Sequence, residues 1–289
     1  MTALLISTGN AHKAQEIQQI LAADYQYLTL NDFPGAPAAV EDGATFAANA
    51  GKKVSALADW LAAKPHAGVV GRALRARRAG HHESTPSTPS TTSTIPPHEA
   101  ARASGTVGRY SVEPSIPSPR EAGRGPGRGV PSLPGWLCQD APDLPFYVIA
   151  DDSGLEVDAL NGAPGVHSAR FAALDGAGAD NSPDRANNTK LLRLLEGVPA
   201  ARRTARFRCV LAVRRLFLPS PAETVFFEGV CAGRIGLQPA GGGGFGYDPL
   251  FIPDGYTQSF AELGEAVKNS LSHRALALEK LRRYLAEQA

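Results

Sequence analysis

Residues 150–158 read Ala-Asp-Asp-Ser-Gly-Leu-Glu-Val-Asp and follow the apolar segment 146–150. That segment has the length and composition of a buried strand. The sequence therefore predicts a strand, then a glycine turn that holds two adjacent carboxylates, Asp151 and Asp152, and the Ser153 hydroxyl. Adjacent carboxylates are costly to bury, and a divalent cation such as Mg²⁺, which prefers carboxylate oxygen, would explain them. The alternative is a turn in which one aspartate caps the loop and the other is solvated. This run alone leaves both open.

The flanking segments alternate between strand-like and helix-like patterns, which favours an α/β fold with a mixed sheet. The last two strands are joined through Pro219-Ser220-Pro221 and predict an antiparallel hairpin. Strands are expected at 3–8, 25–30, 146–150, 155–159, 204–218 and 224–235, and helices at 13–23, 45–63, 184–195 and after Ser272.

Composition changes abruptly near residue 65 and recovers near residue 144. The segment 65–143 is rich in Pro, Ser, Thr, Gly and Arg and has few large apolar side chains to offset the entropy of ordering. We therefore expect one discontinuous domain, formed by residues 1–64 and 144–289, interrupted by a disordered insertion at 65–143. The arginines there permit weak contact with RNA or phosphate, but a solvated insertion without a catalytic role is the favoured interpretation.

Bulk properties narrow the class of protein. The formal net charge of +1 argues against nucleic acid or an anionic membrane as the main partner. No apolar run reaches membrane-spanning length, and the N-terminal residues lack the pattern of a secretory signal. Cys138, Cys209 and Cys231 are odd in number and lack metal-type spacing. We expect a cytoplasmic protein with reduced thiols.

Two motifs near the N-terminus point to anion binding. Residues 7–13, Ser-Thr-Gly-Asn-Ala-His-Lys, join the first strand to the first helix, where free backbone N–H groups and Lys13 favour a phosphate. Asn10 as an ordinary helix N-cap is the alternative. Residues 41–46, Glu-Asp-Gly-Ala-Thr-Phe, place acids before the next helix, which capping also explains. Lys53 on that helix is placed to face a phosphate near Glu41.

Two motifs near the C-terminus point to a nucleobase. Residues 241–249, Gly-Gly-Gly-Gly-Phe-Gly-Tyr-Asp-Pro, bring an aromatic ring that can stack on a base and an acid that can bind its edge. A tight loop around a buried phenylalanine is the alternative. Residues 268–274 group Lys268, His273 and Arg274 at a helix entrance that Ser272 caps, and this grouping suits an anionic ligand with a keto-bearing base.

Together these motifs resemble the inosine/xanthosine triphosphate pyrophosphatases, also called dITP/XTP pyrophosphatases, which hydrolyse deaminated purine nucleoside triphosphates. They appear in the family's order and cover nearly everything outside the insertion. The resemblance implies a two-lobed α/β fold with a mixed sheet, a cleft between the lobes, a homodimer and dependence on Mg²⁺. It implies release of pyrophosphate by attack of water on the α-phosphorus, which clears such nucleotides from the pool.

The resemblance also implies roles for individual residues. Asp152 is expected to accept the proton and, with Glu41, to hold Mg²⁺. The family often has two acids before Gly-x-Thr-Phe, so Asp42 is the alternative to Glu41. The residues implied to bind substrate are Thr8, Gly9, Asn10, Ala11, His12, Lys13, Lys53, Ser153, Phe245, Gly246, Tyr247, Asp248, Lys268, His273 and Arg274. A nucleotide-binding sensor without hydrolysis, whose insertion contacts a partner or RNA, is the competing interpretation.

Overall fold

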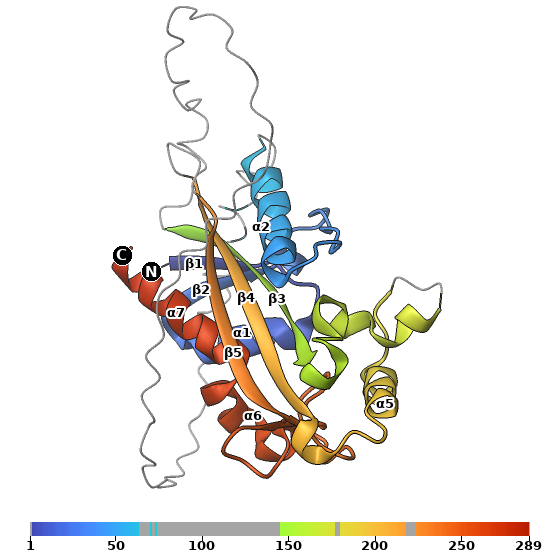
Figure 1. Cartoon of the computed structure of the whole chain (residues 1–289). Helices are drawn as coiled ribbons and strands as arrows, with labels where there is room; N and C mark the ends of the chain where they lie inside the picture. The colour runs from blue at the N-terminus through green and yellow to red at the C-terminus, as the bar shows by residue number, and fades with distance from the viewer. Residues whose placement is uncertain are drawn as a thin grey trace, which may run out of the picture.

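A six-stranded mixed sheet forms the centre of the computed structural model, which describes residues 2–63, 70, 73, 145–176, 180–217 and 223–288 (Figure 1). The sheet has the strand order β2-β1-β3-β4-β5-β6. The strands are β1 (Thr2–Ile6), β2 (Tyr25–Thr29), β3 (Phe146–Val157), β4 (Thr204–Leu216), β5 (Val225–Ile235) and β6 (Phe251–Pro253). The α-helices are α1 (Ala11–Leu21), α2 (Phe46–Ala62), α5 (Asp184–Leu194), α6 (Phe260–Leu271) and α7 (His273–Glu287).

Strand directions confirm the predicted mixed sheet. β1 runs parallel to both β2 and β3, while β3–β4, β4–β5 and β5–β6 are antiparallel. The predicted pairing of the two long C-terminal strands is correct, although residues 218–222 between them lie outside the described part of the chain. All four predicted helices appear: α1, α2 and α5 have small shifts at their ends, and α7 begins directly after Ser272, whereas α6 and β6 had not been predicted.

The predicted turn at Asp151–Gly154 is wrong, because β3 continues through it without a break. Asp152 pairs with Val210 and Gly154 with Arg208 on β4. Gly154 does not form a turn. Its lack of a side chain lets another backbone segment pack closely against β3. A Cβ there would lie 2.5 Å from the carbonyl oxygen of Gly165, at the start of the 3-10 helix η4 (Gly165–Arg170).

Helices cover both faces of the sheet. α2 packs on one face and α1 and α7 on the other, each against its own cluster of buried apolar side chains. A third cluster surrounds the far half of β3, β4 and β5 together with α5, α6 and β6, and forms the second lobe. Because successive strand residues point to opposite faces, Asp152 lies on the α2 face and Asp151 on the face of α1 and α7.

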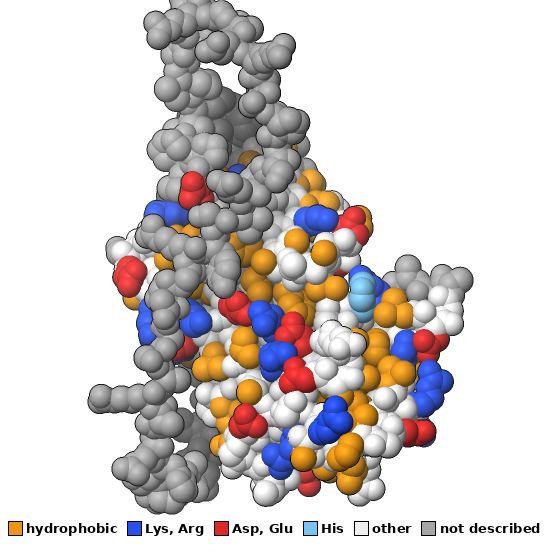
Figure 2. Space-filling view, in the orientation of Figure 1, with side chains coloured by type: hydrophobic (Ala, Val, Ile, Leu, Met, Phe, Trp, Pro, Cys, Tyr) orange, Lys and Arg blue, Asp and Glu red, His pale blue; other side chains and the backbone are white. Residues whose placement is uncertain are grey.

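Acidic and basic side chains are interspersed on the face shown in Figure 2. Ion pairs across the strands include Arg208 with Glu228 (2.5 Å) and Arg206 with Glu156 (2.9 Å). No helix in the described part of the chain is long and apolar enough to cross a membrane.

Most of the predicted insertion lies outside the described residues. Of 65–143, only Val70 and Ala73 are described, and Val70 is buried in the cluster that packs under α2. The division into 1–64 plus 144–289 therefore stays a prediction. Cys209 and Cys231 are free and buried, and Cys138 lies outside the described residues.

We expect Gly154→Ala to lower the free energy of unfolding by about 1–3 kcal/mol, the usual cost of an overpacked interior. The added methyl would collide with the backbone of η4 and with the Ser168 hydroxyl, 2.4 Å from its position. Urea unfolding measures this change. Gly242→Ala is the control, because a Cβ there meets no atom within 4 Å. Equal stability of the two variants would show that η4 does not hold β3.

Candidate active site

The loop after β1 opens α1 and presents its N-terminus at the carboxyl end of the parallel strands. Asn10 caps the helix, its Oδ1 accepting from the backbone N–H of Lys13 (3.2 Å), and Thr8 Oγ1 accepts from the Asn10 N–H (3.2 Å). The first helical turn leaves backbone N–H groups that suit an anion. Lys13 Nζ lies 2.5 Å from Asp151 Oδ1, which ties this loop to β3.

Asp151 is fully buried and accepts from four side chains. Lys13 Nζ (2.5 Å) and Ser153 Oγ (3.1 Å) contact Oδ1, while Arg274 Nε (3.2 Å) and Cys209 Sγ (3.1 Å) contact Oδ2. Burial opposes ionisation, but the Arg274 guanidinium and the Lys13 ammonium outweigh it and hold the pKa of Asp151 well below its usual range. Asp151 is therefore a permanently ionised anchor. Burial raises the pKa of the Cys209 thiol, which keeps it a hydrogen-bond donor.

Asp152 faces a separate cluster under α2. Its Oδ2 accepts from Asn49 Nδ2 (3.0 Å), and its Oδ1 lies 3.6 Å from Lys53 Nζ. Glu41 Oε1 lies 2.8 Å from the same ammonium, so the structure brings Glu41 and Asp152 together. Burial raises the pKa of Asp152, and Lys53 only partly offsets it.

The geometry separates Glu41 from Asp42. Asp42 pairs with Lys52, and its side chain is 66% exposed, so it does not join the cluster. Glu41 is therefore the acid that shares a cation with Asp152. Within the described residues, no group of three or more His, Cys, Asp or Glu side chains could hold a metal ion. A metal here would have two carboxylates from the protein.

A second set of buried ion pairs continues from Arg274 toward α6. Glu16 on α1 pairs with Arg274 and with Lys268 Nζ (2.7 Å), and Lys268 also pairs with Asp248 (2.6 Å). Glu16 was missed from the sequence, although its place three residues after Lys13 puts both side chains on one face of α1. Acidic and basic groups thus alternate without a break from Lys13 to Asp248.

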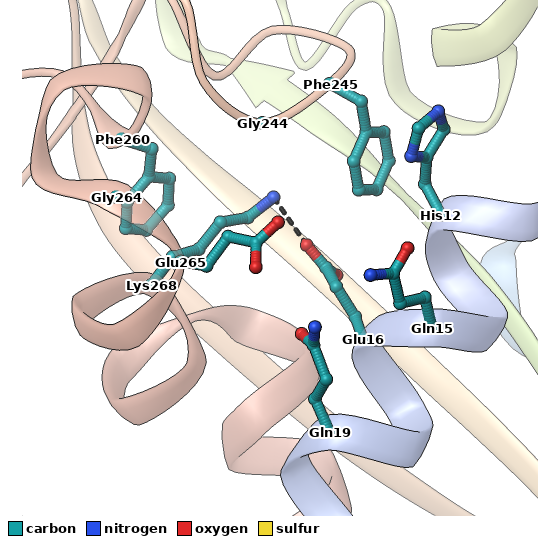
Figure 3. A pocket seen from close by; sticks show the side chains of 10 residues that line it. All are labelled: His12, Gln15, Glu16, Gln19, Gly244, Phe245, Phe260, Gly264, Glu265 and Lys268. Carbon is teal, nitrogen blue, oxygen red and sulfur yellow. Dashed lines mark ion pairs between the residues drawn. The ribbon is translucent and has the colours of Figure 1, made fainter. Parts of the chain in front are cut away.

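A pocket of about 210 Å³ lies between α1 and α6, below the ring of Phe245 (Figure 3). The Phe245 ring lies between His12, which stacks on it with centroids 5.4 Å apart, and Lys268 Nζ, 4.4 Å from its centroid. The lining residues are His12, Gln15, Glu16, Gln19, Gly244, Phe245, Phe260, Gly264, Glu265 and Lys268. The alternating ion pairs connect this pocket to Lys13 and Asp151. A hydrogen bond from Lys53 Nζ to the Asp151 carbonyl oxygen (3.1 Å) links Asp151 to the cluster around Asp152.

Some predicted binding residues face away from the pocket. The buried Tyr247 hydroxyl donates to the carbonyl of Ser168 (2.9 Å), and the Gly246 N–H donates to Asp184 (2.6 Å), so both fix the loop. Asp248 is buried beside Lys268 and accepts from the Phe245 N–H (2.9 Å). Gly246, Tyr247 and Asp248 therefore do not line the pocket.

His273 lies at the start of α7, buried and stacked on Phe207 with centroids 4.8 Å apart. Its Nδ1 has no hydrogen-bond partner among the described residues. Burial, with Arg274 and Lys268 nearby, holds the pKa of His273 well below its usual range, so the ring is neutral. Buried polar atoms usually have a hydrogen-bond partner, and the described residues do not supply one for this nitrogen.

Comparison with known proteins agrees with this arrangement. The family model described as the Ham1 family matches residues 4–71 and 137–284. The chain belongs to the Ham1 family. This confirms the resemblance drawn from the motifs. The match leaves residues 72–136 unassigned, a segment that lies inside the predicted insertion.

Individual relatives extend the match. Over 98% of its length the chain is 33% identical to a dITP/XTP pyrophosphatase of Shouchella clausii, of which it covers 96%. It is 56% identical over 133 residues to a dITP/XTP pyrophosphatase of Desulforamulus reducens, and this match covers 46% of the chain and 61% of the relative. The chain thus spans about six-tenths of the first curated relatives that it matches.

Solved structures show the same fold. The chain is similar to the Staphylococcus aureus Ham1 protein, with a TM-score of 0.61, 25% identity and 100% of both chains covered. It is also similar to a HAM1 protein from Coxiella burnetii, with a TM-score of 0.60, 25% identity and coverage of 99% and 100%. The predicted two-lobed mixed-sheet fold is confirmed.

We expect Asp151→Asn to lower the free energy of unfolding by about 3–5 kcal/mol, because it leaves the buried Lys13 and Arg274 without their counter-ion. Chemical denaturation at neutral pH measures the change. Asp42→Asn is the control, since its exposed pair with Lys52 should contribute nothing measurable. An Asp151→Asn protein as stable as the wild type would remove Asp151 from the structural role assigned to it.

Proposed function

We propose that the protein hydrolyses deaminated purine nucleoside triphosphates, namely ITP, dITP and XTP, to the monophosphate and pyrophosphate, and so clears them from the nucleotide pool. One observation carries the proposal: buried ion pairs lead from an aromatic-lined pocket at Phe245 to Lys13 and Asp151. Asp152, the next residue of β3, lies in a cluster with Lys53 and Glu41, and Lys53 also donates to the Asp151 carbonyl oxygen. A purine nucleotide needs both surfaces, in this order. The names of the similar relatives, dITP/XTP pyrophosphatase, support the same substrate class.

The phosphate end is built from cations on different elements. Lys13 on α1 and Lys53 on α2 lie on either side of β3, and each contacts an aspartate there. Lys268 reaches the pocket from α6. Such groups, fixed before substrate arrives, neutralise phosphate charge without reorganising during the reaction. The N-terminus of α1 adds backbone N–H donors.

Glu41 and Asp152 fit a magnesium ion. Both offer hard carboxylate oxygens, and both already lie against one positive charge, the Lys53 ammonium. Mg²⁺ is usually held by one or two carboxylates, with water and substrate phosphates as its other ligands. When bound, the ion would supply charge neutralisation on the phosphate oxygens.

The reaction proposed is hydrolysis at the α-phosphorus. A water oxygen forms a bond to that phosphorus, the bond to the bridging oxygen breaks, and pyrophosphate leaves. Asp152 takes a proton from this water. The Asp152 carboxylate is itself held in place by Asn49 and Lys53. Asp151 stays bound to Lys13 and Arg274 and positions both.

Selectivity is expected at the entrance of α7. The 6-keto group of hypoxanthine or xanthine would accept from donors of residues 272–274, where the first helical N–H groups lie. Adenine presents an amino donor at this position. Two donors facing each other leave a buried group unpaired, at about 1–3 kcal/mol.

A homodimer and a cytoplasmic location complete the proposal. Both rest on the family resemblance, and the location rests also on the free cysteines Cys209 and Cys231. Sedimentation of the purified protein tests the dimer.

We expect Asp152→Asn to lower kcat for pyrophosphate release from ITP by about 10²–10⁴-fold, the usual contribution of a general base. Pyrophosphate and phosphate are assayed separately with ITP, XTP, dITP, ATP and GTP in the presence of Mg²⁺. Circular dichroism checks that the variant folds. Turnover at the wild-type rate would refute the role of Asp152, and release of phosphate instead of pyrophosphate would refute the reaction.

We expect Glu41→Gln to raise the Mg²⁺ concentration needed for half-maximal activity about tenfold or more, since loss of even an outer partner of a metal site costs 10–100-fold. Asp42→Asn is the matched control and should leave this concentration unchanged, because Asp42 faces Lys52 instead of Asp152. A Mg²⁺ titration of both variants gives the answer. The reverse pattern would assign the metal to Asp42.

A further inference from the structure

The imidazole of His12 lies flat against the ring of Phe245. The ring centroids are 5.4 Å apart and the planes are inclined by 17°. Within the described part of the chain, the His12 side chain has no hydrogen bond or ion pair, and it is exposed. The contact with Phe245 is therefore the interaction that fixes this side chain. His12 had been assigned to the triphosphate with the rest of its loop, but it faces the aromatic ring.

Two cations approach the Phe245 ring, Lys268 Nζ at 4.4 Å and the Arg274 guanidinium at 6.0 Å from its centroid, and among the described residues His12 is the aromatic ring that stacks on it. Phe245 sits in the glycine-rich run 241–246, and its backbone N–H is tied to Asp248. The ring lies between His12 and the Lys268 ammonium (Figure 3). Lys268 itself is fixed by Glu16 and Asp248.

A ligand that stacks on the Phe245 ring would replace the contact on one of its faces and leave the contact on the other face unchanged. His12 and Lys268 both line the pocket, and His12 already covers one face of the ring. A base that stacks on Phe245 therefore takes the face over which the Lys268 ammonium lies, in exchange for that contact. His12 then remains the stacking partner on the opposite face. Because His12 already restrains the Phe245 ring, the ring loses less conformational entropy when a base stacks on its other face.

We propose that His12 is a positioning residue for the purine base, stacking behind Phe245 so that histidine, phenylalanine and base form three parallel layers. The inference deepens the proposed function, on which it rests. This role requires an aromatic side chain at position 12, and it does not require that side chain to form a hydrogen bond or an ion pair. The structure thus assigns His12 to base affinity and leaves phosphate binding to Lys13 and the α1 N-terminus.

The test compares His12→Ala with His12→Phe in the full-length protein. Binding of IMP, measured by calorimetry, needs no turnover. We expect His12→Ala to weaken IMP binding about five- to tenfold, the value of an aromatic pair, and to raise KM for ITP equally while kcat is unchanged. His12→Phe should stay within about twofold of the wild type, because it keeps the stacking surface. Gln18→Ala, on the same helix but outside the pocket lining, is the matched control.

A second measurement separates stacking from phosphate contact. Inorganic tripolyphosphate has no base, so its inhibition constant should be the same for His12→Ala and the wild type. A rise in that constant, unchanged IMP binding by His12→Ala, or a His12→Phe protein as weak as His12→Ala would each overturn the proposal. A wild-type protein that binds IMP but releases no pyrophosphate from ITP would refute the proposed function alone. Failure of the wild type to bind IMP would refute both.

Discussion

The buried pair between Asp151 and Arg274 is the contact on which the rest of the site depends. Removing two charges from water is costly, and such a pair is stable only when its remaining hydrogen-bonding capacity is filled. Here Lys13, Ser153 and Cys209 complete the carboxylate, and Glu16 completes the guanidinium. Because these groups come from α1, β3, β4 and α7, one ionised aspartate fixes the position of the N-terminus of α1 relative to the start of α7. The pocket and the N-terminus of α1 are therefore held by one continuous network of ion pairs.

The alternation of side chains along β3 gives two neighbouring aspartates different tasks. Asp151 points into the cations of α1 and α7 and has a lowered pKa, whereas Asp152 points toward α2 and has a raised one. A turn would have placed both carboxylates in one environment, where they would repel. A strand places the backbone between them, so one can stay ionised as an anchor while the other remains free to meet substrate. The lysine from α2 bridges the two environments, since Lys53 Nζ also donates to the Asp151 carbonyl oxygen (3.1 Å).

Local signals in the sequence were sufficient for most elements and caps. Asn10 and Ser272 cap α1 and α7 as expected, because N-capping is decided within four residues. Contacts between distant segments could not be anticipated. Gly154 suggested a turn, but its small size serves the approach of η4, which only the folded chain reveals. Glu16 was missed because its partners Lys268 and Arg274 lie some 250 residues away along the chain. The loop motif around Phe245 predicted a binding loop, and Phe245 does line a pocket, but no pattern shows that Tyr247 turns into the core.

The place of the unmatched segment 72–136 explains how the fold tolerates it. The chain leaves α2 at Ala62 and re-enters the sheet at Phe146, which pairs with Ala3 near the start of β1. Asp152 lies further along β3, about 20 Å from that point at the usual rise of a strand. Lys53 lies about 13 Å back along α2 at the helical rise. At the site itself, α2 is joined to β3 by the contacts of Asn49 and Lys53 with Asp152, so the geometry of the carboxylates does not depend on the length of chain between the two elements. An insertion at the other end of β3, between Asp152 and η4, would instead disturb the close packing of Gly154 against η4.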